Sequence, residues 1–174
     1  MVGSLRWQKG YPDALDAFSK FHENRPDWRL DIAGVGPLHD ELEARAREMH
    51  LEDSVRFLGM RSRDQVAALM RESRLFLLSS VSEGFPKVLL EASASGLPIV
   101  TTDVGSCRDL AEEGVGLAVE AGNPDAITTA LESMASDEDL WHSSSKRGPE
   151  VAKEHSWEAT ADVVRNAYSK ALSR

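Results

Sequence analysis

Apolar residues follow two patterns that alternate along the chain. Short apolar runs are typical of buried strands, and an i, i+3, i+4, i+7 spacing is typical of amphipathic helices. The helical spacing is clearest between Ala14 and Phe21. Strands are predicted at residues 2–5, 28–33, 54–59, 74–79, 98–102 and 114–119. Helices are predicted at residues 11–24, 38–50, 64–72, 86–95, 107–112, 124–136 and 156–172, and a further one starting at residues 137–140 and ending in a polar bend at residues 143–148.

This alternation predicts an α/β fold: a Rossmann-like, doubly wound parallel sheet of six strands with helices on both faces. Residues 1–174 are expected to form one domain. Residues 2–5 look like the end of a strand, so either the first strand is very short or the chain is a piece of something longer. Ligands of such sheets bind at the carboxyl ends of the strands. That edge is expected to hold residues 4–10, 34–37, 59–61, 79–87 and 103–107.

The stretch from Ser82 to Gly96 is the most informative part of the chain. Pro86 suits the first position of a helix, and Gly96 suits its C-cap. The helix between them is mostly apolar or small and is expected to be buried, where the carboxylate of Glu91 would be costly without a partner. The helix N-terminus, beside Glu83, is a ready anion site because of its free N–H groups and its dipole.

Charge and cysteine content exclude several classes of protein. The chain has a net charge of −9 and so lacks the excess of basic residues that is typical of a nucleic-acid-binding protein. The single cysteine, Cys107, excludes an internal disulfide and a multi-cysteine metal site, and is expected at the start of a helix. No histidine pair has metal-ligand spacing. The chain has no apolar run of bilayer-spanning length and no signal-peptide pattern, so a cytoplasmic location is expected.

Three other motifs are weaker. Gly34-Val35-Gly36-Pro37 resembles a dinucleotide fingerprint, but His39 stands where the third glycine should be, which argues against a nicotinamide or flavin. The turn could still lie close to a different nucleotide. Lys9 is either a phosphate ligand at this edge or an ordinary surface lysine. Ser79, Ser80 and Ser82 do not form a nucleophile elbow.

Two carboxylates bracketing a helix N-terminus suit a sugar nucleotide. One of Glu83 and Glu91 would bind ribose hydroxyls and the other the sugar, while Lys9 and the helix dipole would bind the diphosphate. The alternative is that Glu91 pairs with a buried arginine or with backbone.

Several blocks, in order, resemble one family. The signature is Glu83-(x7)-Glu91 within residues 82–100. It is accompanied by matching blocks at residues 2–10, 32–37, 55–59, 102–105 and 155–158. The chain is similar to the C-terminal, nucleotide-sugar-binding domain of the family 4 glycosyltransferases, which are retaining enzymes of the GT-B fold.

The resemblance implies a role for each matching residue. Glu91 would hold the ribose hydroxyls, Glu83 would contact the donor sugar and Lys9 the diphosphate, with Glu83 and Lys9 as the catalytic pair. Backbone from Gly84 to Leu89 would follow the diphosphate and sugar, and Gly59 to Arg61 would lie near the base. The implied donor-binding residues are Ser4, Arg6, Lys9, Gly34, Gly59, Met60, Arg61, Glu83, Gly84, Phe85, Pro86, Lys87, Val88, Leu89 and Glu91.

The implied reaction moves a hexosyl group from a UDP- or GDP-sugar to an acceptor, with retention and without an obligatory metal or other cofactor, in a pathway such as polysaccharide biosynthesis. The family's N-terminal acceptor domain is absent from this sequence. The isolated chain is therefore expected to bind the donor weakly and to transfer little, and any peripheral membrane association would come through the missing domain. The family also usually has an arginine where Ser4 stands, and Arg6 is the candidate replacement.

Two other functions stay open from the sequence. One is a GT-B-fold sugar-nucleotide epimerase, which the Glu83/Glu91 pattern disfavours. The other is a non-catalytic module that pairs with a separate acceptor-domain subunit.

Overall fold

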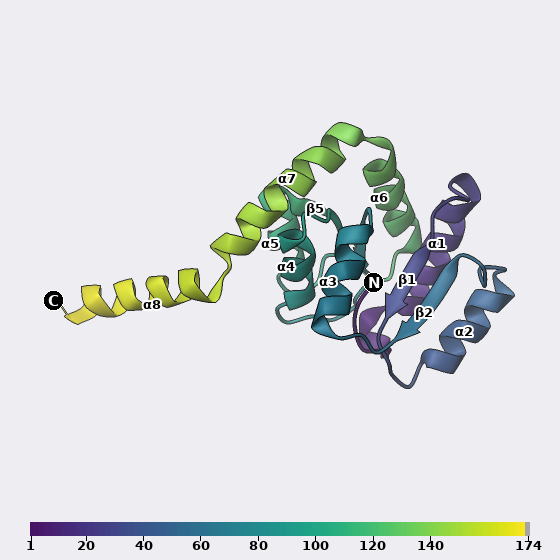
Figure 1. The fold of residues 1–174 in the computed structure, drawn as a ribbon, viewed down its shortest axis with the longest axis horizontal. Coiled ribbons are helices and arrows are strands. Elements are labelled where there is room, and N and C mark those ends of the chain that lie inside the picture. Colours follow the sequence, from purple (N-terminus) through teal and green to yellow (C-terminus); the bar gives the residue numbers. More distant parts are fainter. Residues whose placement is uncertain (173–174) are drawn as a thin grey trace.

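Two parallel strand ladders form the centre of the computed structural model, which describes residues 1–172 (Figure 1). One ladder pairs β1 (Leu30–Ala33) with β2 (Val55–Gly59). The other has the order β3 (Phe76–Leu78), β4 (Ile99–Thr102) and β5 (Gly116–Val119). The helical elements are η1 (Trp7–Lys9), α1 (Tyr11–Asn24), α2 (His39–Glu48), α3 (Arg63–Glu72), α4 (Lys87–Ala94), α5 (Cys107–Leu110), the π-helical turn η2 (Ala111–Val115), α6 (Pro124–Ser136), α7 (Glu138–Glu154) and α8 (Trp157–Leu172).

The first predicted strand, residues 2–5, is reduced to a single parallel bridge between Val2 and Ala33, so five strands are present in the described residues instead of six. The amide of Gly3 donates to the Ala33 carbonyl at 3.0 Å, so the N-terminal run follows β1. Met1 and Val2 also line a small cavity together with Phe76 of β3. Residues 1–5 therefore lie between the two ladders (Figure 1).

Apolar side chains from the β3–β5 ladder enter two separate clusters, one on each face. Val100 packs into the cluster that contains α1 and α6, whereas its neighbour Ile99 packs into the cluster that contains α4 and α7. Leu77 and Leu78 of β3 divide in the same way. Successive residues of a strand point to opposite faces. The predicted α/β architecture with helices on both faces is thus confirmed.

Local signals account for the helices that were predicted best. α1 has the predicted bounds because its apolar stripe is continuous and buried. α6 also has its predicted bounds: the side chain of Asn123 accepts a hydrogen bond from the Ala126 amide at 3.0 Å, with Pro124 at the first position. After α4, the amide of Gly96 donates to the Ser93 carbonyl at 2.9 Å, as expected for the end of a helix.

The predicted bend at residues 143–148 is wrong. α7 continues through it, with Pro149 inside the helix. Ser144, Gly148 and Val151 are buried on its inner side. A Cβ at Gly148 would lie 2.6 Å from the Ser93 carbonyl oxygen, so only glycine allows this close packing of α7 against α4.

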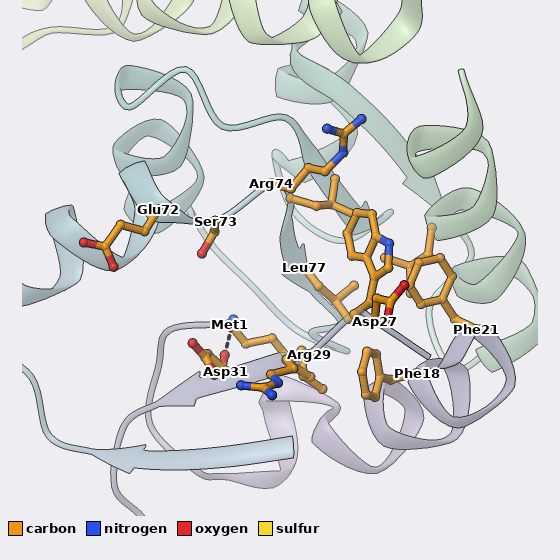
Figure 2. A pocket seen from close by; sticks show the side chains of 14 residues that line it. Met1, Phe18, Phe21, Asp27, Arg29, Asp31, Glu72, Ser73, Arg74 and Leu77 are labelled. Atoms are coloured by element: carbon orange, nitrogen blue, oxygen red, sulfur yellow. Dashed lines mark hydrogen bonds between the residues drawn. The ribbon is translucent and has the colours of Figure 1, made fainter. Parts of the chain in front are cut away.

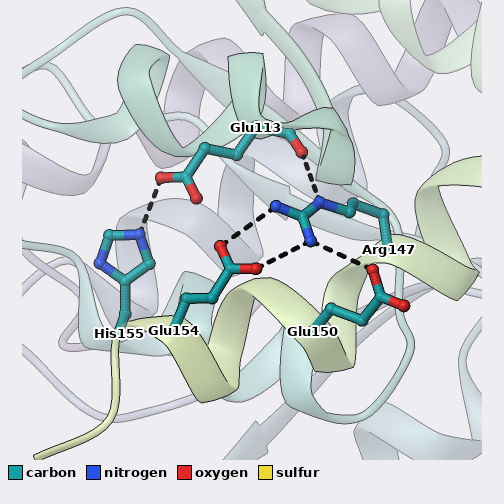
Figure 3. Close-up of polar contacts among 5 residues, drawn as sticks. All are labelled: Glu113, Arg147, Glu150, Glu154 and His155. Carbon is teal, nitrogen blue, oxygen red and sulfur yellow. Dashed lines mark hydrogen bonds and ion pairs between the residues drawn. The ribbon is translucent and has the colours of Figure 1, made fainter. Parts of the chain in front are cut away.

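A network of polar contacts joins the C-terminal part of α7 to Glu113 of η2 (Figure 3). The Arg147 guanidinium donates to the carboxylates of Glu150 and Glu154 at 3.0–3.1 Å, and to the Glu113 carbonyl at 3.2 Å. The His155 ring lies 2.7 Å from the Glu113 carboxylate. These contacts fix the point where α8 leaves the rest of the chain.

α8 projects away from the other elements (Figure 1). Ser156 caps its N-terminus, because the Ala159 amide donates to the Ser156 hydroxyl at 3.2 Å. Its large apolar and aromatic residues Trp157, Val164 and Tyr168 are all exposed. Within residues 1–172, no helix combines the length and the apolar character needed to cross a bilayer.

Candidate functional site

Lys9 and Glu83 meet at the carboxyl edge of the strands. The Lys9 ammonium nitrogen lies 2.5 Å from Oε1 of Glu83. The two side chains are only 22% and 12% exposed, so the ion pair is largely shielded from water. The structure therefore brings together the two residues predicted to act on the donor.

Buried hydroxyl groups surround this pair. Ser80 donates to the same Glu83 oxygen, Oε1, at 2.7 Å, and its own carbonyl accepts a hydrogen bond from Thr102 at 2.5 Å. The Tyr11 hydroxyl donates to the Gly3 carbonyl at 3.1 Å. Burial, and then the negative charge of Glu83, raises the pKa of Tyr11. Sequence reasoning missed Ser80 and Tyr11, because it considered the serines only as nucleophiles and Tyr11 only as the start of a helix.

The turn before α4 presents backbone to the same edge. Pro86 is the N-cap residue and not the first helical residue, so α4 begins one residue later than predicted, and no side chain caps the helix. Gly84, Phe85 and Lys87 are exposed, whereas Pro86 is buried. The side chains of Leu89 and, in part, Val88 pack into the core, so these two residues can reach a ligand only through their backbone.

The expectation that Glu91 is a buried, costly carboxylate is wrong. Glu91 is exposed, as are Lys87 and Ala94, which lie one turn away on the same face of α4. No ion pair involves Glu91 in the described part of the chain, so the pairing with a buried arginine is also excluded there. Glu91 is available to a ligand.

A second group of predicted residues lines a cavity of about 250 Å³ beside the N-terminal run. Ser4, Gly34, Met60 and Arg61 contribute to its wall, and the Gly34 amide donates to the Gly59 carbonyl at 2.9 Å. The remaining wall is mostly apolar: Val2, Gly3, Ala33, Val35 and Val66. Arg6, the proposed replacement for the family's arginine, is exposed at the start of η1 and does not line this cavity.

The loop after β4 supports the Glu83–Gly84 turn. Gly105 has φ of 55°, and a Cβ there would lie 2.3 Å from the Glu83 carbonyl oxygen. The Ser106 hydroxyl donates to the Gly84 carbonyl at 3.3 Å. Arg108 pairs with Asp103 at 2.6 Å and holds the pKa of that carboxyl below its usual value. The loop after β4 therefore packs against the Glu83–Gly84 turn and supports its position.

The start of α8 contacts the same turn from another side. The Lys87 ammonium lies 5.9 Å from the centre of the Trp157 ring, and the rings of Phe85 and His155 are 6.4 Å apart. Residues 155–158 belong to the blocks that carry the family resemblance, but sequence reasoning missed this contact.

Another cavity lies away from this edge of the strands. It measures about 400 Å³ and sits near the amino ends of β1 and β3, against Phe18, Phe21 and Leu77 (Figure 2). In it, the Met1 amino group donates to the Asp31 carbonyl at 2.7 Å, and burial lowers the pKa of that amine to about 5. No predicted site residue lines this cavity.

Among residues 1–172, no group of three or more histidine, cysteine, aspartate or glutamate side chains is placed to hold a metal ion. Cys107, the first residue of α5, is buried, and burial raises the pKa of its thiol.

Comparison with known proteins identifies the family. The profile described as "Glycosyl transferases group 1" matches residues 1–151. The chain belongs to this family. It is 32% identical over 175 residues to a D-inositol 3-phosphate glycosyltransferase from Corynebacterium urealyticum, covering 96% of this chain and 41% of that protein. Across the first curated relatives, the chain spans 40–47% of their length.

Solved structures confirm the GT-B type of fold. The C-terminal domain of a glycosyl transferase group 1 family protein, LpcC from Francisella tularensis, superimposes with a TM-score of 0.80 at 22% identity, covering 88% of this chain and 83% of that one. Anabaena HepE in complex with UDP matches with a TM-score of 0.82 at 23% identity, covering 99% of this chain and 47% of that one.

Proposed function

We propose that this domain binds a nucleotide diphosphate sugar and, together with an acceptor-binding domain, transfers its hexosyl group with retention at the anomeric carbon, as in the family 4 glycosyltransferases. The observation that carries the proposal is the shielded Lys9–Glu83 pair, which lies at the carboxyl edge of the strands. Glu83 comes from the turn that starts α4. A cation, a carboxylate and free helix N–H groups are then available at one place to a diphosphate and a sugar.

Each part of the donor has a matching group in this proposal. Lys9 and the first turn of α4 bind the diphosphate, Glu83 accepts hydrogen bonds from the sugar, and exposed Glu91 binds the ribose hydroxyls. The cavity lined by Met60 and Arg61 takes the base. Negative charge develops on the leaving diphosphate as the sugar departs, and Lys9 and the α4 N-terminus stabilise that charge.

Relatives support the choice of nucleotide to test first. Anabaena HepE was solved with UDP and with UDP and glucose, and pneumococcal GtfA with UDP and GlcNAc. UDP and UDP-glucose are therefore the first probes, with GDP and a GDP-sugar as the second pair.

A second domain is part of the proposal. Met60 and Phe85 are 73% and 54% exposed at the site, and Trp157 is 79% exposed beside it. Apolar surface of this kind, rimmed by polar groups, is typical of a contact surface. We assign it to an acceptor-binding domain, on the same chain in the longer relatives or on a separate subunit. Any peripheral membrane attachment would belong to that domain, and the location is proposed to be cytoplasmic.

The domain alone is expected to bind donor without efficient transfer, because the acceptor must be held beside the anomeric carbon for the reaction to proceed. Donor binding is proposed not to need a metal, since Lys9 and the helix supply the positive charge. The same affinity in EDTA and in Mg²⁺ would support this part of the proposal, and a requirement for Mg²⁺ would overturn it.

Isothermal titration calorimetry with UDP, UDP-glucose, GDP and GDP-mannose tests the proposal directly. Binding of one nucleotide family, with its sugar conjugate, is the expected result. No heat of binding with any of the four would refute it. With a partner domain present, product analysis separates sugar transfer from epimerisation, and co-purification of a second Rossmann-like subunit would support the two-subunit form.

A further inference from the structure

The Glu83 carboxylate is held asymmetrically. Its Oε1 accepts two hydrogen bonds, from Lys9 at 2.5 Å and from Ser80 at 2.7 Å. Within residues 1–172, its Oε2 accepts none. One oxygen is therefore committed to the protein and the other is left for a ligand.

The backbone of Ser80 is held in place by hydrogen bonds of its own carbonyl and of the residues before and after it. Ser80 is fully buried, and Thr102 on the neighbouring strand donates to its carbonyl at 2.5 Å. Residues on either side bind the N-terminal segment, since Ser79 donates to the Lys9 carbonyl at 2.9 Å and the Val81 amide donates to the Gln8 carbonyl at 2.8 Å. A hydroxyl on such a fixed backbone sets the direction of the carboxylate that it binds.

Glu83 has a longer side chain than Ser80, with more rotatable bonds to fix. It lies in the turn before α4, next to Gly84, whose position has no neighbouring atom within 4 Å of an added Cβ. A glutamate side chain in such a turn has several rotamers, and the Lys9 side chain is equally long. Two long side chains lose considerable entropy when they are held in one geometry, so a rigid third group has a large effect on their placement.

We propose that Ser80 is a positioning residue of the donor site. By donating to Oε1, Ser80 keeps the Lys9–Glu83 pair together when the donor binds and turns Oε2 toward the hydroxyl groups of the donor sugar. Lys9 has three N–H donors and uses one on Glu83, which leaves two for the diphosphate. The pair then acts as one unit, and it does not have to break before the donor enters. This inference rests on the proposed function.

The opposite possibility is a latch, in which the ion pair blocks the empty site and opens on binding. In that case the loss of Ser80 would loosen the latch and strengthen donor binding. The two possibilities therefore predict opposite signs for the same variant.

The test is Ser80→Ala in wild-type and Glu83→Ala backgrounds, titrated with UDP and UDP-glucose. Ser80→Ala should lower the affinity for UDP-glucose about tenfold more than that for UDP. It should have no such selective effect when Glu83 is already alanine, because it acts through that carboxylate. Ser80→Thr should restore the wild-type ratio of the two affinities.

Ser93→Ala is the matched control. Ser93 is a fully buried serine on α4 whose hydroxyl has no hydrogen-bond partner, so this variant should leave the ratio of the two affinities unchanged.

A second measurement does not depend on the donor. The NMR signal of the Lys9 ammonium group should be protected from solvent exchange in the wild type and in Ser93→Ala, and should lose that protection in Ser80→Ala. Tighter donor binding in Ser80→Ala, an equal loss with and without Glu83, or unchanged protection of Lys9 would each overturn the role of Ser80. If no nucleotide binds to the wild type, the proposed function fails, and the Lys9 signal still decides whether Ser80 holds the pair.

Discussion

The α-carbon of Gly105 packs directly against the backbone of Glu83. A Cβ at position 105 would lie 2.3 Å from the Glu83 carbonyl oxygen, which is far inside contact distance. The loop after β4 thus limits where the turn that carries Glu83 can lie.

Gly105→Ala should displace that turn. The variant combines a left-handed backbone with a steric clash, and we expect a loss of at least about 2 kcal/mol in the free energy of unfolding. Donor binding should weaken as Glu83 moves. Gly122→Ala is the control for backbone strain alone, since Gly122 has φ of 71° but no atom within 4 Å of the added Cβ. Urea unfolding and calorimetry measure the two effects, and equal behaviour of both variants would contradict the role of the contact.

Glu91→Ala should weaken nucleotide binding without destabilising the domain. Glu91 is exposed, so the free energy of unfolding should stay within about 0.5 kcal/mol of the wild-type value. Loss of the ribose contacts should lower the affinity for UDP about tenfold, with a smaller loss for deoxy-UDP. Glu48→Ala, at another exposed helix position, is the control. Unchanged UDP affinity would mean that Glu91 is only a surface residue.

Glu83→Ala should separate sugar recognition from diphosphate recognition. Removing the carboxylate deletes the proposed contact to the sugar but leaves the Lys9 charge for the diphosphate. The affinity for UDP-glucose should therefore fall about tenfold relative to that for UDP, as measured by calorimetry. Equal losses for the two ligands would argue against a contact between Glu83 and the sugar.

The Arg147 network should make stability depend on acid pH. Hydrogen bonds from Arg147 hold the pKa of Glu154 below its usual value of 4.5. The folded state then binds fewer protons than the unfolded state, so this stabilisation is complete above the usual pKa and is lost as the pH falls through the lower folded value. The stability difference between wild type and Arg147→Gln should shrink from neutral pH to about pH 3. Arg165→Gln, which removes an ion pair within α8, is the charge-matched control. A difference that does not change with pH would contradict this assignment.

The elements that the sequence predicted well are those whose signals are local. α1 and α6 have a continuous apolar stripe, a proline near the first position and clear terminal residues. α7 was predicted poorly because the polar residues before Pro149 suggest a bend when taken alone. Its helix is maintained by packing against α4, where Gly148 fits against Ser93, and no local pattern contains that contact.

The candidate site shows the same division. Lys9, Glu83 and residues 59–61 could be placed at one edge because loops at the carboxyl ends of parallel strands converge, and their expected roles came from the family resemblance. The exposure of Glu91 could not, because it depends on which face of α4 meets the core. Ser80 was also missed: its hydrogen bond to Glu83 depends on a side-chain direction that the sequence pattern does not report.

Two residues after β3 hold the N-terminal segment: the Ser79 hydroxyl donates to the carbonyls of Lys9 and Gly10, and the Val81 amide donates to the Gln8 carbonyl. β3 belongs to one strand ladder, and the N-terminal run follows the other. Lys9 belongs to the N-terminal segment and Glu83 follows β3, so a diphosphate sugar bound to both would link the two ladders. As more sites fill with ligand, mass action would stabilise the contact between the N-terminal segment and the residues after β3. Amide hydrogen exchange at that contact would therefore slow as the bound fraction rises.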